Sequence, residues 1–250
     1  MDKIIYIAIA FLFLACDSEN GADCFKKEGA IVSKEISVAP FTEIIVFERV
    51  QLFIEEGPIQ KVIVVSGENL IEDVEVKVTG TILSLTDTNY CNFVRDYDIT
   101  KVYVTSPNIT KIRNSSSLEI TSVGVLTYPE LELLSENYEN EELYRTDGDF
   151  NLSLHVNYVS VASNGHSTFR LNGIANRAVF GLYAGNTRIL SENLIVNKLR
   201  LFHRSTSPMV VNPIVSIQGE IVGIGDVIAK SRPTIIEVEE LFTGRLIFED

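Results

Sequence analysis

In the second half of the chain one short pattern recurs about every twenty residues, and this repeat limits the possible folds more than any other feature. Each unit has two stretches rich in alternating apolar residues, separated by a small polar turn. A single unit cannot bury its apolar side, but stacked units can, with their strands lying parallel over one another. The repeat therefore predicts a parallel β-helix or solenoid, and a β-sandwich is the alternative that also spaces strands regularly. The four units are residues 158–171, 178–190, 198–211 and 215–228.

The rest of the chain also favours strands over helices. Residues 74–79 alternate cleanly, and Gly80 in a tight turn leads to a second strand at 82–85. Residues 136–144 could hold a few turns of helix. We expect an all-β fold in a single domain, residues 24–250, with a β-rich region at its N-terminal end as a cap. Other expected strands lie within 101–105, 111–120, 131–135 and 235–238.

The N-terminus has the features of an export signal. Residues 4–14 are an apolar run of eleven residues, which as a helix spans about half of a ~30 Å hydrocarbon core. Such a run is typical of a signal peptide rather than a membrane span. Ala15-Cys16 then resembles a bacterial lipobox, in which the cysteine receives acyl chains such as palmitate, although Phe13 replaces the usual Leu. We predict a lipoprotein signal peptide at residues 1–15 and a lipidated Cys16 with a spacer at 16–23; cleavage near Ala15 as a plain secretion signal is the alternative.

The charge balance bears on partners and location. The chain has 34 acidic and 21 basic residues, a formal charge of -13, and this argues against a nucleic-acid binder, which needs a basic surface. No other stretch approaches ~20 apolar residues, so the predicted membrane attachment is the lipid on Cys16. Residues 17–20 resemble the acidic export tags of some Gram-negative lipoproteins. We expect an outer-membrane lipoprotein of a Gram-negative bacterium, at the cell surface or on the periplasmic face.

Two cysteines remain if Cys16 is lipidated. An exported, oxidising setting makes a disulfide between Cys24 and Cys91 the favoured state, and two buried thiols are the alternative. Closing a loop of this size stabilises by roughly 4 kcal/mol through loop-closure entropy.

Several stretches together resemble one family of bacterial envelope lipoproteins, the auto-transporter adhesin "head GIN domain" family, across nearly all of residues 36–250. The family's repeated Ser-Gly-Ser-Gly-Asp turn keeps its form here only at residues 223–226 and has decayed at 114–117, 163–166 and 184–187. The resemblance implies a right-handed β-helix and a binding role, and it implies no catalytic residues. The stretches that carry it are residues 38–44, 50–57, 69–70, 74–78, 102–109, 219–227, 232–233 and 243–244.

No catalytic or metal-binding motif stands out. Asp96 and Asp98, like Asp147 and Asp149, place two acids on one side of a strand, but turn or surface roles are favoured in so acidic a chain. With Asn151 the second pair begins a calcium-loop pattern, which then fails because Leu152 and Tyr158 occupy the glycine and glutamate positions. The three histidines could contribute to a zinc site only if turns bring them together, and exposed turn positions are favoured; they are His155, His166 and His203.

The remaining candidate is a binding face of arginine and aromatic residues, against the alternative of an ordinary β-surface. We expect a non-catalytic envelope lipoprotein, an adhesin or binding module for a glycan or an envelope protein, without catalytic residues, cofactor or metal. The alternatives are a polysaccharide-processing β-helix enzyme and a structural envelope component. The candidate face is Arg170, Tyr183, Arg188, Arg200, Phe202 and Arg204.

Overall fold

The computed structural model describes residues 23–91, 93 and 99–249. Strands dominate these residues, and short 3-10 segments occur at Asp23–Phe25 (η1) and Ile71–Asp73 (η2). The strands are β1 (Ile31–Ile36), β2 (Glu43–Val46), β3 (Gln51–Glu56), β4 (Lys61–Gly67), β5 (Val74–Thr79), β6 (Ile82–Asp87), β7 (Lys101–Ser106), β8 (Lys111–Asn114), β9 (Ile120–Leu126), β10 (Glu130–Ser135), β11 (Phe150–Ser163), β12 (Thr168–Leu182), β13 (Arg188–His203), β14 (Met209–Ile221), β15 (Val227–Ala229), β16 (Ile235–Glu240) and β17 (Leu246–Phe248).

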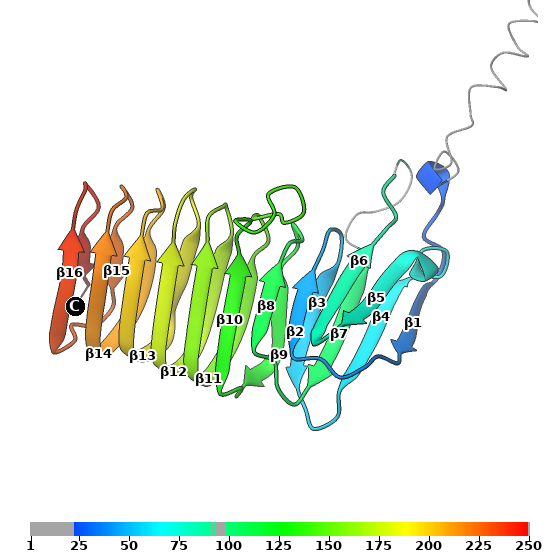
Figure 1. Ribbon diagram of the computed structural model, residues 1–250, viewed down its shortest axis with the longest axis horizontal. Coiled ribbons are helices and arrows are strands. Elements are labelled where there is room, and N and C mark those ends of the chain that lie inside the picture. Colours follow the sequence, from blue (N-terminus) through cyan, green and yellow to red (C-terminus); the bar gives the residue numbers. More distant parts are fainter. Residues whose placement is uncertain (1–22, 92, 94–98, 250) are drawn as a thin grey trace, which may run out of the picture.

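The strands pair into two long ladders. Ladder A runs β1–β4–β7–β3–β9 and continues through the first halves of β11, β12, β13 and β14 to β15 and β17. Ladder B runs β5–β6–β2–β8–β10 and continues through the second halves of β11 to β14 to β16. From β3 in ladder A and β6 in ladder B onward every pairing is parallel, and the strands stack along the long axis of the molecule (Figure 1).

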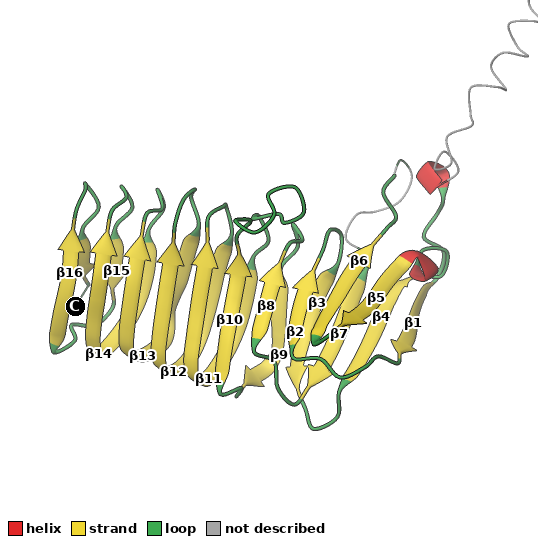
Figure 2. Cartoon of the chain, viewed as in Figure 1, coloured by secondary structure: helices red, strands yellow, loops and turns green. Residues whose placement is uncertain are grey.

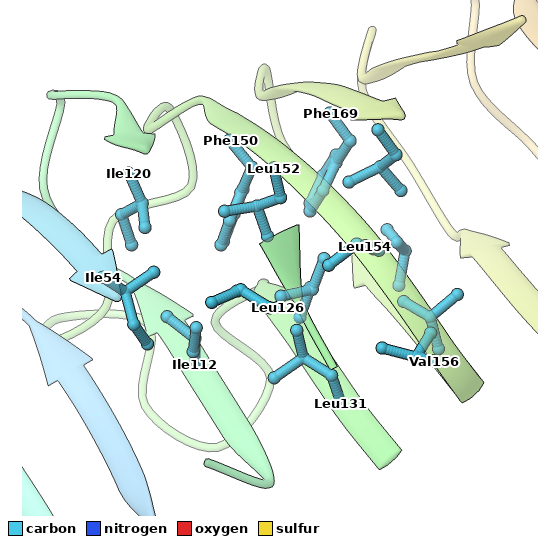
Figure 3. Packing of buried hydrophobic residues seen from close by; sticks show 14 of the residues in the cluster. Ile54, Ile112, Ile120, Leu126, Leu131, Phe150, Leu152, Leu154, Val156 and Phe169 are labelled. Atoms are coloured by element: carbon cyan, nitrogen blue, oxygen red, sulfur yellow. The ribbon is translucent and has the colours of Figure 1, made fainter. Parts of the chain in front are cut away.

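Side chains that alternate along each strand explain this arrangement, because every second one points into the space between the ladders. Phe150 of β11 and Phe169 of β12 are in register, and their rings stack with centroids 4.6 Å apart. Aliphatic residues from both ladders surround this pair in a continuous core (Figure 3). Because each coil covers the apolar side of the next, the repeat buries what one unit alone would expose.

Different hydrogen bonds link successive coils at the two edges of the stack, where the chain passes from one ladder to the other. At one edge the turns between ladder B and ladder A lie over one another (Figure 2), and Asn186 N donates to Gly165 O at 3.0 Å across successive turns. At the other edge β11, β12 and β13 bend at asparagines one coil apart: Asn176 donates to Asn157 at 3.1 Å, and Asn197 to Asn176 at 3.2 Å.

The N-terminal end of the stack is antiparallel. β1 pairs with β4 and β4 with β7 at the end of ladder A, while the β5–β6 hairpin closes ladder B. β2 and β3 therefore lie between strands that follow them in the chain, since β6 and β7 stack on one side of them and β8 and β9 on the other. Among the residues described, no helix is long and apolar enough to span a membrane.

The structure confirms the all-β prediction, and the four repeat units are each a strand, a turn and a strand. Parallel pairing of successive units excludes the antiparallel layers that a β-sandwich requires. The expectation of helix at residues 136–144 is wrong: the segment is a loop with one turn, in which Asn140 Oδ1 accepts from Glu142 N and Leu143 N. Asn140 accepts as a helix N-cap does, and Tyr144 N donates to the Asn140 carbonyl at 3.1 Å, but this single turn is not continued after Tyr144.

Candidate functional site

One connection departs from the regular turns. The segment 136–149, which we call the long loop, joins β10 to β11, whereas the corresponding connections in later coils have four or five residues. It folds back over the outer side of ladder B, where Arg113 of β8 holds it. The Arg113 guanidinium lies 2.8 Å from the Glu136 carboxylate and donates to the Glu136 carbonyl at 2.6 Å. It also lies 4.2 Å from the ring centroid of Tyr144.

The Arg113–Glu136 pair is almost completely buried, with the two side chains 6% and 10% exposed. A buried ion pair costs desolvation energy, so it gives the loop a defined position more than it adds stability. Contacts to neighbouring turns extend this anchoring: Arg145 pairs with Glu48 at 2.6 Å, and the Phe47 and Tyr144 rings stack at 6.3 Å. The long loop is thus fixed at several points.

Between the long loop and ladder B lies a groove of about 650 Å³. Its floor includes outward residues of five strands, and Lys111 bridges Glu132 at 3.2 Å and Glu43 at 3.7 Å. Partial burial acts to lower the pKa of Lys111, but the hydrogen bond and charge of Glu132, with the charge of Glu43, raise it above its usual value. The lining residues are Glu43, Ile44, Ile45, Ile82, Lys111, Arg113, Glu132, Leu134, Glu136, Tyr138, Glu139, Tyr144, Ala162 and Tyr183.

A second hollow of about 370 Å³ adjoins the first on ladder B, and Tyr183 lines both. Three aromatic rings connect them: Tyr138 meets Tyr183 edge to face at 6.3 Å, and Tyr183 stacks on Phe202 at 5.5 Å. Gly181 makes room for this row, since a Cβ there would come within 2.5 Å of the Tyr183 hydroxyl. We call Tyr138, Tyr183 and Phe202 the aromatic row.

The six arginine and aromatic residues of the predicted binding face lie at separate places in the structure. Tyr183, Arg200 and Phe202 come together at the second hollow on ladder B. Arg170 belongs to ladder A, where its guanidinium lies 3.1 Å from both Glu119 and Asp149. Arg188 begins β13 in ladder A and Arg204 lies in the turn after β13, so the six residues do not share one face.

The histidines do not meet. His166 is exposed in a turn and bonds Asn186 at 2.7 Å, and His155 is exposed on β11. His203 differs from the expected exposed position, because it ends β13 with its side chain directed into the core and fully buried. Burial lowers the pKa of His203 to about 4, although the backbone at Gly225 and Ser207 and the charge of Asp226 act to raise it.

Of the two acidic pairs that the sequence offers, the structure describes Asp147 and Asp149, and both accept hydrogen bonds from neighbouring residues. Asp149 accepts hydrogen bonds from Thr168 N at 2.7 Å and Arg170 at 3.1 Å, and Asp147 accepts from the Ser117 hydroxyl at 2.9 Å. Within the described ranges no three His, Cys, Asp or Glu side chains are arranged to hold a metal ion. Asp96, Asp98, Cys16 and the predicted signal peptide lie outside the described residues.

Cys24 and Cys91 form a disulfide, as the sequence predicts. It joins η1 to the segment after β6, and the Phe25 and Phe93 rings beside it lie 5.9 Å apart. The predicted pairing therefore attaches the start of the domain to the N-terminal end of the stack.

Sequence reasoning missed the groove because its parts are far apart in the chain. In the sequence Arg113 is one more polar residue of a predicted strand. The residues beside it in the sequence do not indicate that residues 136–149 bury it. The loop carries one usable signal: the spacing between strands widens there, in an otherwise regular series. A long connection in a compact domain is often functional.

A comparison with family models identifies the family of this chain. The family model described as "Putative auto-transporter adhesin, head GIN domain" matches residues 40–233. The chain belongs to this family. The match begins before β2 and ends before β16, so the groove residues of this GIN-domain protein lie within it.

Solved structures share the fold of this GIN-domain protein at low identity. A "putative adhesin" from Bacteroides fragilis is 17% identical, with a TM-score of 0.78, and the alignment covers 90% of this chain and 100% of the other. One from Parabacteroides merdae is 15% identical, with a TM-score of 0.61 and coverage of 90% and 99%. A "putative lipid binding protein" from Parabacteroides distasonis is 16% identical, with a TM-score of 0.61 and coverage of 89% and 100%. No curated protein matches the chain.

Proposed function

We propose that this protein is a non-catalytic binding module of the Gram-negative cell envelope. The observation that carries the proposal is the groove on ladder B, in which a long loop fixed by a buried ion pair borders a row of aromatic side chains. Concave sites with aromatic walls and a few polar groups are typical of ligand recognition. The family description as an adhesin supports the same role.

The charged groups of the groove support binding rather than catalysis. Glu43 and Glu132 both face Lys111, and Glu136 is engaged by Arg113. A glycosidase or lyase needs carboxyl groups poised to exchange protons with a substrate. Carboxylates paired with cations in this way act as fixed charges and hydrogen-bond acceptors, so the polysaccharide-processing enzyme is the weaker candidate.

The proposal includes the anchor and the architecture. A lipid on Cys16 would tether the protein to the outer membrane, with residues 17–23 as the spacer and the surface-exposed side favoured. The parallel coils would form a right-handed β-solenoid capped by the antiparallel N-terminal strands, a shape that presents a long face to glycans or envelope proteins. A structural role in an envelope assembly would use the same face without a soluble ligand.

Two experiments test the proposal. Cys16→Ser should move the full-length protein from the membrane fraction to the soluble fraction, and a variant that stays membrane-bound would refute the anchor. Residues 24–250, wild type and Tyr183→Ala, should be compared as baits for envelope extract and for a glycan array. Capture that depends on Tyr183 supports the binding module, and equal capture by both baits refutes the groove as its site.

A further inference from the structure

The groove has properties that narrow the class of ligand it can take. It continues along the stack axis, because the second hollow adjoins the first at Tyr183. The wide part lies under the long loop, and the narrow part lies against β12, β13 and β14. Tyr138 is 62% exposed and Tyr183 is 40% exposed, so ring surface is available to a ligand in both parts. A site of this form suits a linear ligand better than a compact one.

The floor of the groove disfavours an extended peptide. Strands β2, β6, β8, β10, β11, β12, β13 and β14 each pair with a neighbour on both sides within ladder B. Their backbone donors and acceptors are used in these ladders, and a peptide strand adds to a sheet only at an unpaired edge. An amphipathic helix needs a largely uncharged groove, whereas six of the fourteen residues that line the wide hollow are charged. The ligand must therefore be recognised by side chains alone.

The negative charge of the residues that line the groove disfavours anionic ligands. The wide hollow is lined by Glu43, Glu132, Glu136 and Glu139 but by only two cations, Lys111 and Arg113. Both cations already contact carboxylates, with Arg113 also 3.4 Å from Glu139. The excess of negative charge repels an anionic ligand, and the whole chain at -13 reinforces this field.

We propose that the groove binds a non-acidic glycan chain lying along the stack, with sugar-ring faces against the aromatic row and hydroxyl groups bonded to the glutamates. This inference rests on the proposed binding function and names the ligand class for the same site. The C–H face of a sugar ring packs against the π face of tyrosine or phenylalanine. Carboxylates accept hydrogen bonds from hydroxyl groups, so the glutamates of the lining offer acceptors to the sugar hydroxyls.

Calorimetric titration of residues 24–250 with three hexasaccharides tests the proposal: β-1,4-linked glucose, β-1,4-linked N-acetylglucosamine and α-1,4-linked galacturonate. We expect one or both neutral hexamers to bind at least about tenfold more tightly than galacturonate. Tyr183→Ala and Phe202→Ala should each weaken the neutral ligand by about tenfold. Tyr103→Ala is the matched control, because Tyr103 is also partly exposed but lies on β7 in ladder A.

A variant that moves Tyr183 without removing it separates recognition from folding. Gly181→Ala should displace the Tyr183 ring, since the new Cβ would meet the flexible end of that side chain. We expect weaker glycan binding with the unfolding midpoint nearly unchanged. Unaltered neutral-glycan binding in Gly181→Ala and Tyr183→Ala would overturn the placement of the site.

The outcomes separate this inference from the function on which it rests. Galacturonate binding as tight as that of the neutral hexamers, or no binding by either neutral hexamer, overturns the non-acidic glycan. If an envelope protein is still captured in a Tyr183-dependent way, the binding module stands and only its ligand class falls. If Tyr183→Ala changes no binding of any kind, the groove is refuted as the binding site and the glycan inference falls with it, and if the wild-type protein captures nothing, the binding module falls as well. Shortened hexamers detected by mass spectrometry would refute the non-catalytic role.

Discussion

His203 gives a sharp test of how the stack buries its turns. Its register neighbours are Leu182 in the coil before and Ile221 in the coil after, so an imidazole occupies a position that neighbouring coils fill with aliphatic side chains. The side chain is fully buried, and its ring nitrogens approach the backbone of Gly225 and Ser207 without forming a well-aligned hydrogen bond. We expect His203→Leu to be at least as stable as wild type at pH 7.5, because it removes buried polar atoms that cost about 1–3 kcal/mol when unpaired.

The pH dependence follows from the same burial. The pKa of His203 falls from 6.5 to about 4 in the folded protein. Between these values the imidazole is protonated in the unfolded chain and neutral in the folded one, so the unfolded state binds more protons. The free energy of unfolding therefore falls as pH falls through this window. At about 1.4 kcal/mol for each pKa unit, the loss from this one group is about 3 kcal/mol by pH 4.

Urea unfolding followed by circular dichroism between pH 7.5 and 4 measures this loss. The difference in unfolding free energy between His203→Leu and wild type should grow by about 3 kcal/mol as pH falls. Titration of the many carboxylates cancels in this difference. The control is His166→Leu, which removes an exposed imidazole and leaves the buried His203 in place. Parallel curves for wild type and His203→Leu would refute the reasoning.

Three further predictions concern stability and the long loop. Replacing Cys24 and Cys91 together by Ser should lower the unfolding free energy by up to about 4 kcal/mol, and an unchanged urea midpoint would contradict a structural role for the disulfide. Gly219→Ala should cost about 3 kcal/mol or more, because Gly219 has φ +135° and a Cβ would collide with the preceding coil's backbone; Gly80→Ala, at φ +62° in open space, should cost only about 1–2 kcal/mol in the same assay. Arg113→Met should destabilise by about 3–5 kcal/mol and speed proteolysis within residues 136–149, since it leaves the Glu136 carboxylate buried without its cation; equal cleavage rates would show that the ion pair does not hold the loop.

Most of the architecture can be predicted from the repeat, because the repeat arises from local sequence patterns. Alternating apolar residues mark strands, small polar residues mark turns, and a constant interval requires that successive units stack in register. The four repeat units and the β5–β6 hairpin could therefore be predicted from the sequence alone. The disulfide followed from the predictions that the protein is exported and that Cys16 is lipidated, which leave Cys24 and Cys91 as a pair.

The candidate site depended on contacts between segments that are distant in sequence. Tyr138 and Tyr183 are 45 positions apart, and they meet only because the long loop turns back over ladder B. The burial of Arg113 could not be predicted either, because that loop covers an outward side chain, whereas the inward position of His203 follows the alternation of β13. Local pattern determines which residues form strands and how often they recur. Only the folded chain decides which outward side chains become covered, because the covering segment comes from elsewhere in the sequence.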